Sequence, residues 1–168
     1  YEAFLPEYTV KDWVLFVEAC PRTYDEFINL YGYNDDEFEL ALLYNEANDH
    51  IEFLFSDDRI LEPVCLDMLI KLTHGFYWQA DAAAYLSMHI QSMLKDHPDL
   101  MSTFLKDKDD DLVKDFLKCA ISTPHPEAEN TVYYNEYLKL VEQYKNRSPK
   151  IVRLFKAAHK ELVDEWRE

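Results

Sequence analysis

The chain has 168 residues, 48% of them hydrophobic, and carries a formal net charge of −16. This length suits a domain with one hydrophobic core, and the apolar content excludes an intrinsically disordered chain despite the charge. No apolar run reaches the ~18 residues that a membrane-spanning helix needs, so we expect a soluble chain with no membrane span.

Two short amphipathic helices are predicted first. Thr9 and Thr23 can each accept a backbone hydrogen bond as a helix N-cap, and apolar residues follow both at helical spacing. The first helix is expected to end before Pro21. The second is expected to end at Gly32, in the position that a left-handed C-cap uses.

A longer helical stretch is predicted next, from Asn34 to Phe55, with an interruption near Asn48 as the alternative. No stretch of alternating polar and apolar residues is bounded by hairpin turns, so no sheet is expected.

The middle of the chain continues the helical pattern. Pro63 suits the first turn of a helix that ends at His74-Gly75, and Tyr77 to Lys95 has a second apolar stripe. Pro98 is then expected to open a short helix.

The C-terminal part reads as three helices. A polar turn, Asp107 to Asp111, leads into an amphipathic helix that ends at Ile121, and residues 122–130 are expected to form a loop. Two helices follow, the second capped by Ser148. The whole pattern predicts an all-α fold of about nine helices in antiparallel hairpins, as a single acidic domain over 1–168, with a division into 1–97 and 98–168 as the alternative.

Two of these hairpins share a pattern. The stretches FLKDKDDDLVKDFLKCAI and YKNRSPKIVRLFKAAH each contain a polar turn and a second helix that has a valine followed by a basic residue, Val113-Lys114 and Val152-Arg153. The two valines are 39 residues apart, close to the ~40 residues of a helical repeat. This part of the chain, about 70 residues, resembles the HEAT-repeat family. The resemblance implies a short α-solenoid whose concave face binds other macromolecules, and the alternative is an irregular helical bundle.

Charge is distributed unevenly along the chain. Thirteen acidic residues lie between Asp25 and Asp67 against Arg59 alone, whereas the segment from Lys145 to the end has a net charge of +3. A dense acidic region repels nucleic-acid phosphates and attracts basic partners. We therefore expect a basic protein partner and no direct nucleic-acid binding; the alternative is an acidic face that serves solubility alone.

The residues expected to bind this partner fall in two groups. The acidic group consists of Asp35, Asp36, Glu37, Glu39, Asp49, Glu52, Asp57 and Asp58. The aromatic group consists of Tyr77, Trp78, Tyr133 and Tyr134, because tyrosine and tryptophan are favoured binding anchors, although most aromatic residues are expected in the core.

Catalytic and cofactor motifs are absent from the sequence. With only two glycines, the chain has no P-loop, Rossmann fingerprint or G-x-S-x-G motif. Its three cysteines form neither a disulfide framework nor a C-x-x-C motif, and buried free thiols favour a reducing compartment. We expect no catalytic residues, no cofactor and a cytoplasmic rather than secreted protein; Tyr1 leaves room for an upstream segment that would change the last expectation.

Two patterns were considered as metal sites. Asp107 to Asp111 lacks the glycine and the final glutamate of a calcium loop, and its aspartates suit a helix N-terminus instead. Glu46 and His50 share a helix face, but no second ligand pair with similar spacing accompanies them. We expect no metal site.

The leading hypothesis is a non-enzymatic protein-interaction module of the scaffold or adaptor type. A second hypothesis is an acidic inhibitor or immunity-type protein that neutralises a basic toxin or nuclease. A third is a helical ligand-binding or metal-binding protein or enzyme, with Glu46, Asp49, His50 or His89 lining an internal pocket. The sequence leaves the oligomeric state open.

Overall fold

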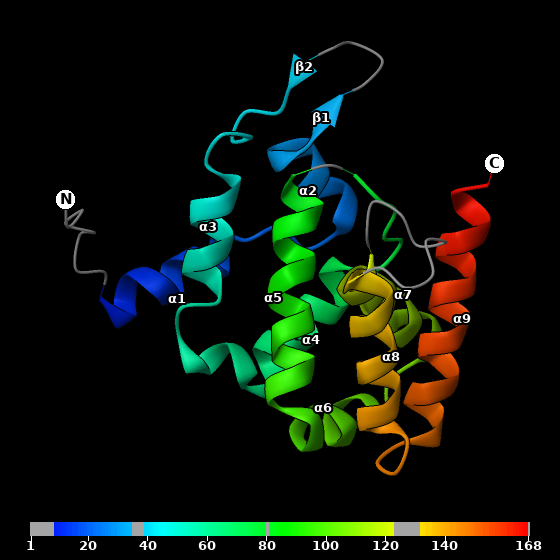
Figure 1. Cartoon of the computed structure of the whole chain (residues 1–168). Coiled ribbons are helices and arrows are strands. Elements are labelled where there is room, and N and C mark those ends of the chain that lie inside the picture. The colour runs from blue at the N-terminus through cyan, green and yellow to red at the C-terminus, as the bar shows by residue number, and fades with distance from the viewer. Residues whose placement is uncertain (1–8, 35–38, 80, 123–131, 168) are drawn as a thin grey trace.

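A computed structural model describes residues 9–34, 39–79, 81–122 and 132–167. In chain order the elements are α1 (Val10–Ala19), α2 (Tyr24–Tyr31), β1 (Tyr33–Asn34), β2 (Glu39–Leu40), α3 (Ala47–Leu54), the 3₁₀ turn η1 (Asp58–Leu61), α4 (Pro63–Leu72), α5 (Ala82–Asp96), α6 (Pro98–Leu105), α7 (Asp110–Ile121), α8 (Val132–Tyr144) and α9 (Pro149–Glu165). The prediction of an all-α fold with about nine helices is confirmed for these residues (Figure 1).

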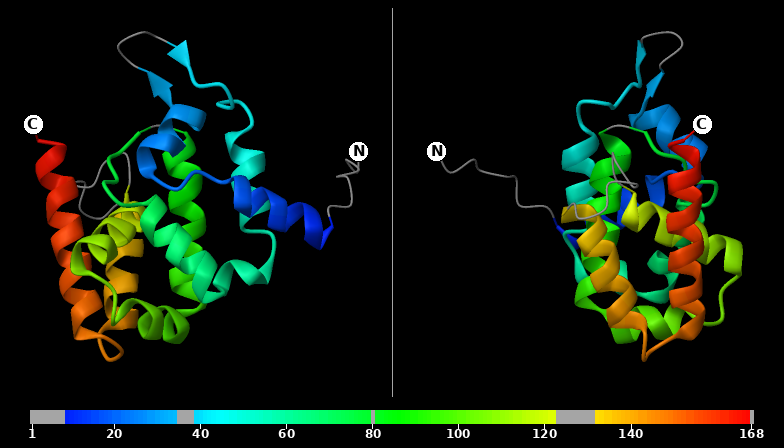
Figure 2. Two further views of the ribbon diagram at one scale, coloured as in Figure 1. Left: turned by 180° about the vertical axis from the view of Figure 1, so that it is seen from behind. Right: turned by 45° about the vertical axis from the view of Figure 1, so that its right-hand side comes forward.

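Helix α7 lies at the centre of the packing. Every residue from Asp115 to Ile121 is buried, and α7 contacts α4, α5, α8 and α9. Figure 2 shows α9 along one side of this assembly, and the hydrophobic core runs without a break from Trp13 in α1 to Leu162 in α9. Because this second half of α7 is buried, its polar residues Asp115 and Lys118 need partners inside the protein.

The predicted N-terminal caps form as expected. Thr9 accepts a hydrogen bond from the backbone of Asp12, whose carboxylate in turn accepts one from the Thr9 backbone, and Thr23 caps α2. The indole of Trp13 donates to the carbonyl oxygen of Leu54 at 3.0 Å and so fixes α1 against α3. Both helix starts therefore follow from local hydrogen bonding.

The prediction of a left-handed C-cap at Gly32 is wrong. The φ angle of Gly32 is −86°, which any residue can adopt. A Cβ atom here would instead lie 2.3 Å from Oε1 of Gln79 and 2.6 Å from the carbonyl oxygen of Ile28. Gly32 is therefore required because neighbouring atoms leave no room for a Cβ atom. The left-handed backbone conformation is found at Gly75 instead, with a φ angle of +78°.

The start of the predicted helix from Asn34 to Phe55 is also wrong, whereas the expectation of an all-α fold without a sheet holds for the described residues except for one pairing of two-residue strands. Strands β1 and β2 pair antiparallel, with Tyr33 opposite Leu40, and helix begins only at Ala47. The side chain of Gln79 holds β1 by accepting from the Tyr33 backbone N–H and donating to its carbonyl oxygen. Strands of two residues are too short to show an alternating pattern, which explains why the sequence did not reveal them.

Helix α5 begins later than predicted, at Ala82 rather than at Tyr77. The Tyr77 carbonyl oxygen accepts a hydrogen bond from the Tyr24 hydroxyl at 2.7 Å, and Gln79 is engaged with β1. Residues 76–79 are thus used as an extended connection that joins the N-terminal elements to the core.

The predicted helices after Pro98 are confirmed. Proline opens α6, Asp109 caps α7 through the backbone N–H groups of Asp111 and Leu112, and Ser148 caps α9. The expected loop lies almost entirely outside the described residues. Helices α6 to α9 cover the stretch of sequence that carries the HEAT-like resemblance, and membership of that family stays a prediction.

Candidate functional site

The segment from β2 through α3 to the start of α4 contains many exposed carboxylates, and Figure 1 shows its backbone in cyan to blue-green. We call this the acidic surface, and it consists of Glu39, Glu46, Asp49, Glu52, Asp58 and Glu62. It includes four of the residues predicted to bind a partner, all of them exposed. Three others, Asp35, Asp36 and Glu37, lie outside the described residues.

Asp57 departs from the prediction because it has an internal partner. Its carboxylate accepts hydrogen bonds from the side chain and backbone of Arg59, which together lower its pKa to about 2. The guanidinium of Arg59 also lies 4.9 Å from the centre of the Trp13 ring. Asp57 therefore caps η1 and orients Arg59.

Ion pairs are absent from the acidic surface and frequent in the C-terminal half. Within the described ranges, none of the six carboxylates lies within 4.0 Å of a cationic side chain. The cations that do form ion pairs after residue 90 are Lys95, Lys106, Lys108, Lys114, Lys118, Lys139, Lys145, Arg147, Lys150 and Arg153. The negative charge of the acidic surface is thus left for solvent or a partner, while most nearby positive charge is used internally.

The predicted aromatic anchors have different environments. Tyr77 is 43% exposed and contacts the ring of Tyr24, whereas Trp78 and Tyr134 are partly buried and pack against the core. The side chain of Tyr133 lies outside the described residues. Of these residues, Tyr77 is the one with a well-exposed ring.

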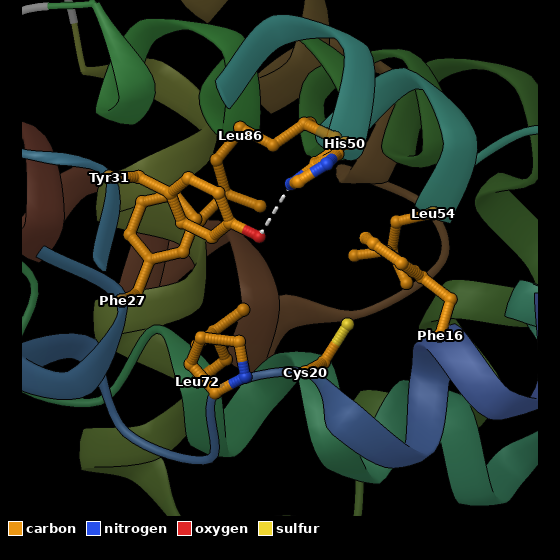
Figure 3. A pocket seen from close by; sticks show the side chains of 10 residues that line it. Phe16, Cys20, Phe27, Tyr31, His50, Leu54, Leu72 and Leu86 are labelled. Atoms are coloured by element: carbon orange, nitrogen blue, oxygen red, sulfur yellow. Dashed lines mark hydrogen bonds between the residues drawn. The ribbon is translucent and has the colours of Figure 1, made fainter. Parts of the chain in front are cut away.

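An apolar cavity lies between α1, α2, α3, α4 and α5 (Figure 3). His50 and Tyr31 contribute its polar atoms, with Nδ1 and the hydroxyl oxygen 3.1 Å apart, and the thiol of Cys20 borders it. Its volume of about 20 Å³ suits a single water molecule. The cavity therefore has no room for an organic ligand.

The proposed ligand set of the third hypothesis does not converge in this cavity. Glu46 and Asp49 are exposed, and the ring of His89 stacks on Phe55, where burial lowers the pKa of the imidazole. In the part of the chain that the structure describes, no three His, Cys, Asp or Glu side chains are grouped as metal ligands.

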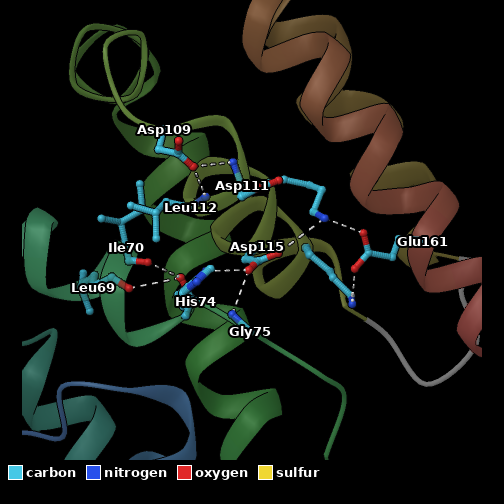
Figure 4. A network of polar contacts seen from close by, with 12 residues as sticks. Leu69, Ile70, His74, Gly75, Asp109, Asp111, Leu112, Asp115 and Glu161 are labelled. Carbon is cyan, nitrogen blue, oxygen red and sulfur yellow. Dashed lines mark hydrogen bonds and ion pairs between the residues drawn. The ribbon is translucent and has the colours of Figure 1, made fainter.

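A second pocket, open and polar, lies between the α4–α5 connection, α7 and α9, with a volume of about 460 Å³. Beneath it the side chain of Lys118 is only 3% exposed, and its ammonium group lies 2.8 Å from Glu161 and 2.5 Å from Glu165. Lys114 lies 2.8 Å from the other oxygen of Glu161. Figure 4 shows Glu161 reaching from α9 across to α7. These contacts join the two helices by charge as well as by apolar packing.

The pKa values in this cluster follow from the pairing. Burial opposes ionisation of Glu161, but the hydrogen bonds from Lys114 and Lys118 outweigh it and lower the pKa of the carboxyl. The hydrogen bond to Glu161 likewise raises the pKa of Lys114. Glu161 and Lys114 are therefore charged near neutral pH.

A histidine–aspartate pair forms the opposite side of the pocket (Figure 4). One oxygen of Asp115 accepts from the Gly75 backbone N–H at 2.8 Å and lies 3.0 Å from Nδ1 of His74. Since an ionised carboxylate only accepts, Nδ1 donates this hydrogen bond, and in the neutral imidazole Nε2 is then an acceptor. The His74 side chain is 58% exposed, so this acceptor is accessible to a binding group.

Tyr77 also lines this polar pocket, and it is the one lining residue that was predicted from the sequence to bind a partner. The available signal was spacing, because Lys114 and Lys118 are four residues apart on α7 and face Glu161 and Glu165, four apart on α9. This complementarity becomes visible only when the two helices are known to pack together.

Comparison of the chain with known protein families, with characterised proteins and with solved structures finds no match. Among the described helices, none combines the length and the apolar character needed to cross a membrane.

Proposed function

We propose that the chain is a non-enzymatic protein-interaction module that holds a basic protein partner on the acidic surface. The supporting observation is the imbalance of pairing: in the described segments, the six carboxylates of that surface have no ion-pair partners, while ten cations of the C-terminal half do. Such a surface raises the rate of encounter with a positively charged protein and repels nucleic acid.

The physical expectation is an interaction that depends strongly on salt. Exposed charges are screened over about 8 Å at physiological ionic strength and over about 3 Å at 1 M. A partner held mainly by the acidic surface is therefore released as salt is added, whereas one held by apolar contacts stays bound.

The test is affinity capture from an extract of the source cells at low and high salt, with two variants of equal charge. The first replaces four carboxylates of the acidic surface by amides: Glu46→Gln, Asp49→Asn, Glu52→Gln and Asp58→Asn. The matched control replaces four exposed carboxylates elsewhere: Asp96→Asn, Asp107→Asn, Glu142→Gln and Asp164→Asn. A basic partner that binds the wild-type chain and the control, but not the first variant, supports the proposal. A partner that binds all three chains equally at high salt contradicts it.

A sharper form of the proposal is an inhibitor or immunity-type protein whose partner is a basic toxin or nuclease. A row of carboxylates can cover a phosphate-binding surface because it offers the same sign of charge as nucleic acid. In this form, the captured partner loses nucleic-acid binding when the chain is added, and the four-amide variant of the acidic surface fails to compete. Simultaneous binding of the partner to the chain and to nucleic acid rules this form out.

A further inference from the structure

The polar pocket between the α4–α5 connection, α7 and α9 has acceptor groups that the protein does not use. Asp111 makes no side-chain hydrogen bond or ion pair with the rest of the described chain, and the ion pair of Glu165 involves Oε1. His74 adds the accessible Nε2 atom, because Asp115 holds Nδ1. The α4–α5 connection, α7 and α9 thus each contribute a hydrogen-bond acceptor to the polar pocket.

The cations of the pocket are already engaged. Its four carboxylates are Asp111, Asp115, Glu161 and Glu165, against the two ammonium groups of Lys114 and Lys118. Lys118 is buried between two glutamates, and Lys114 is paired with Glu161. The four carboxylates therefore exceed the two ammonium groups by two negative charges, which favours a cationic occupant.

An aromatic ring borders the same pocket. Tyr77 is 43% exposed, and burial together with the nearby charge of Asp25 raises the pKa of its hydroxyl. Asp25 therefore adds negative potential near the ring. An exposed tyrosine with carboxylates nearby is a favourable surface for a planar cation, which can stack on the ring while its edges donate hydrogen bonds.

We propose that this pocket receives an arginine side chain of the protein partner. The inference rests on the proposed function, since the arginine belongs to the basic protein held by the module. A guanidinium group has five N–H donors in one plane and can stack on an aromatic ring, and the lining of this pocket offers acceptor groups of Asp111, Glu165 and His74 together with the ring of Tyr77. A lysine ammonium group lacks the plane and is more strongly hydrated, so it binds less well here.

The first experiment is an NMR titration of the whole chain with three acetylated, amidated tripeptides, in which arginine, lysine or citrulline lies between two glycines. We expect the arginine peptide to shift the Gly75 amide and His74 imidazole signals and to bind at least about threefold more tightly than the lysine peptide. The neutral citrulline peptide should not bind. A fourth probe, N-acetyl-arginine methylamide, tests whether a free small molecule is the better occupant.

Two variants test the named groups. Asp111→Asn should weaken binding of the arginine peptide about fivefold, and Tyr77→Leu by a similar factor, because each removes one exposed contact to the cation. Asp107→Asn is the matched control, since Asp107 is exposed, precedes Asp111 by four residues and does not line the pocket. Thermal unfolding of each variant shows whether the fold is kept.

The outcomes separate this inference from the proposed function. Selective arginine binding that Asp111→Asn weakens supports the inference, even before a partner is identified. Shifts confined to the acidic surface, or equal binding of the arginine and lysine peptides, overturn it. A partner that is lost with the four-amide variant of the acidic surface but unaffected by Asp111→Asn and Tyr77→Leu also overturns it, while the proposed function stands. Binding of the methylamide more tightly than the peptide indicates a small-molecule site instead.

Discussion

Replacing Lys118 by methionine would remove the cation that lies between Glu161 and Glu165 while keeping most of the side chain's apolar length. The ammonium group is 3% exposed and contacts both carboxylates, so its loss leaves two glutamates side by side with Lys114 as their remaining partner. We expect the variant to fold and to be less stable.

The size of the expected loss of stability depends on how exposed the side chains of Glu161 and Glu165 are. Breaking a fully buried ion pair costs about 3–5 kcal/mol, because an uncompensated charge remains in the interior. Here the glutamate side chains are 36% and 43% exposed, so water solvates them in part and the cost falls to about 2 kcal/mol. For a chain of this size that corresponds to a decrease in Tm of about 4–8 °C.

The assay is urea unfolding followed by circular dichroism, with Lys145→Met as the matched control. Lys145 is exposed and 3.3 Å from Glu142, so its loss should cost less than about 0.5 kcal/mol. A Lys118→Met variant as stable as this control, or more stable than the wild-type chain, would refute the reasoning, because the ion pairs would then not offset the cost of burying the lysine.

Three further predictions concern other parts of the molecule. Gly32→Ala should reduce the free energy of unfolding by about 1–3 kcal/mol, measured in urea, because the new methyl group would overlap Gln79 and the Ile28 carbonyl oxygen. Burial raises the pKa of Cys20 to about 11, so about 0.1% of the thiol is ionised at pH 8. Alkylation of Cys20 in the folded chain, followed by mass spectrometry, should therefore be far slower than in the unfolded chain. Equal alkylation rates would contradict this prediction. The lowered pKa of Glu161 means that its stabilisation is complete above the ordinary value of 4.5 and is lost as the pH falls through the lower folded value. The stability difference between wild-type chain and Glu161→Gln, from urea unfolding at several pH values, should therefore shrink below pH 4.5; a constant difference would contradict it.

Helix starts were predictable because their signals are local. Thr9, Thr23 and Ser148 each bond to a backbone N–H three residues ahead, so a short window of sequence contains the whole interaction. The boundaries of α3 and α5 were mispredicted because contacts with residues distant in the sequence determine the backbone conformation there. Gln79 holds Tyr33 across 46 residues of sequence, and no local pattern announces that contact.

The same contrast applies to the candidate sites. The exposure of Asp49 and Asp58 was predictable, because charged side chains without partners stay in water. The burial of Lys118 was not, because it depends on which helix covers that face of α7. Charge spacing shows that α7 and α9 are complementary, but only the packing shows that they meet.

The position of α7 has a consequence for how the chain acquires its structure during synthesis. Helices α4 and α5 precede α7 and pack against it, and α9, which also packs against it, follows it in the chain. Their apolar faces therefore lack a central partner until residues 110–121 have left the ribosome. A nascent chain that stops before α7 leaves the apolar residues of α4 and α5 that face α7 uncovered, and we expect it to be held by chaperones or degraded.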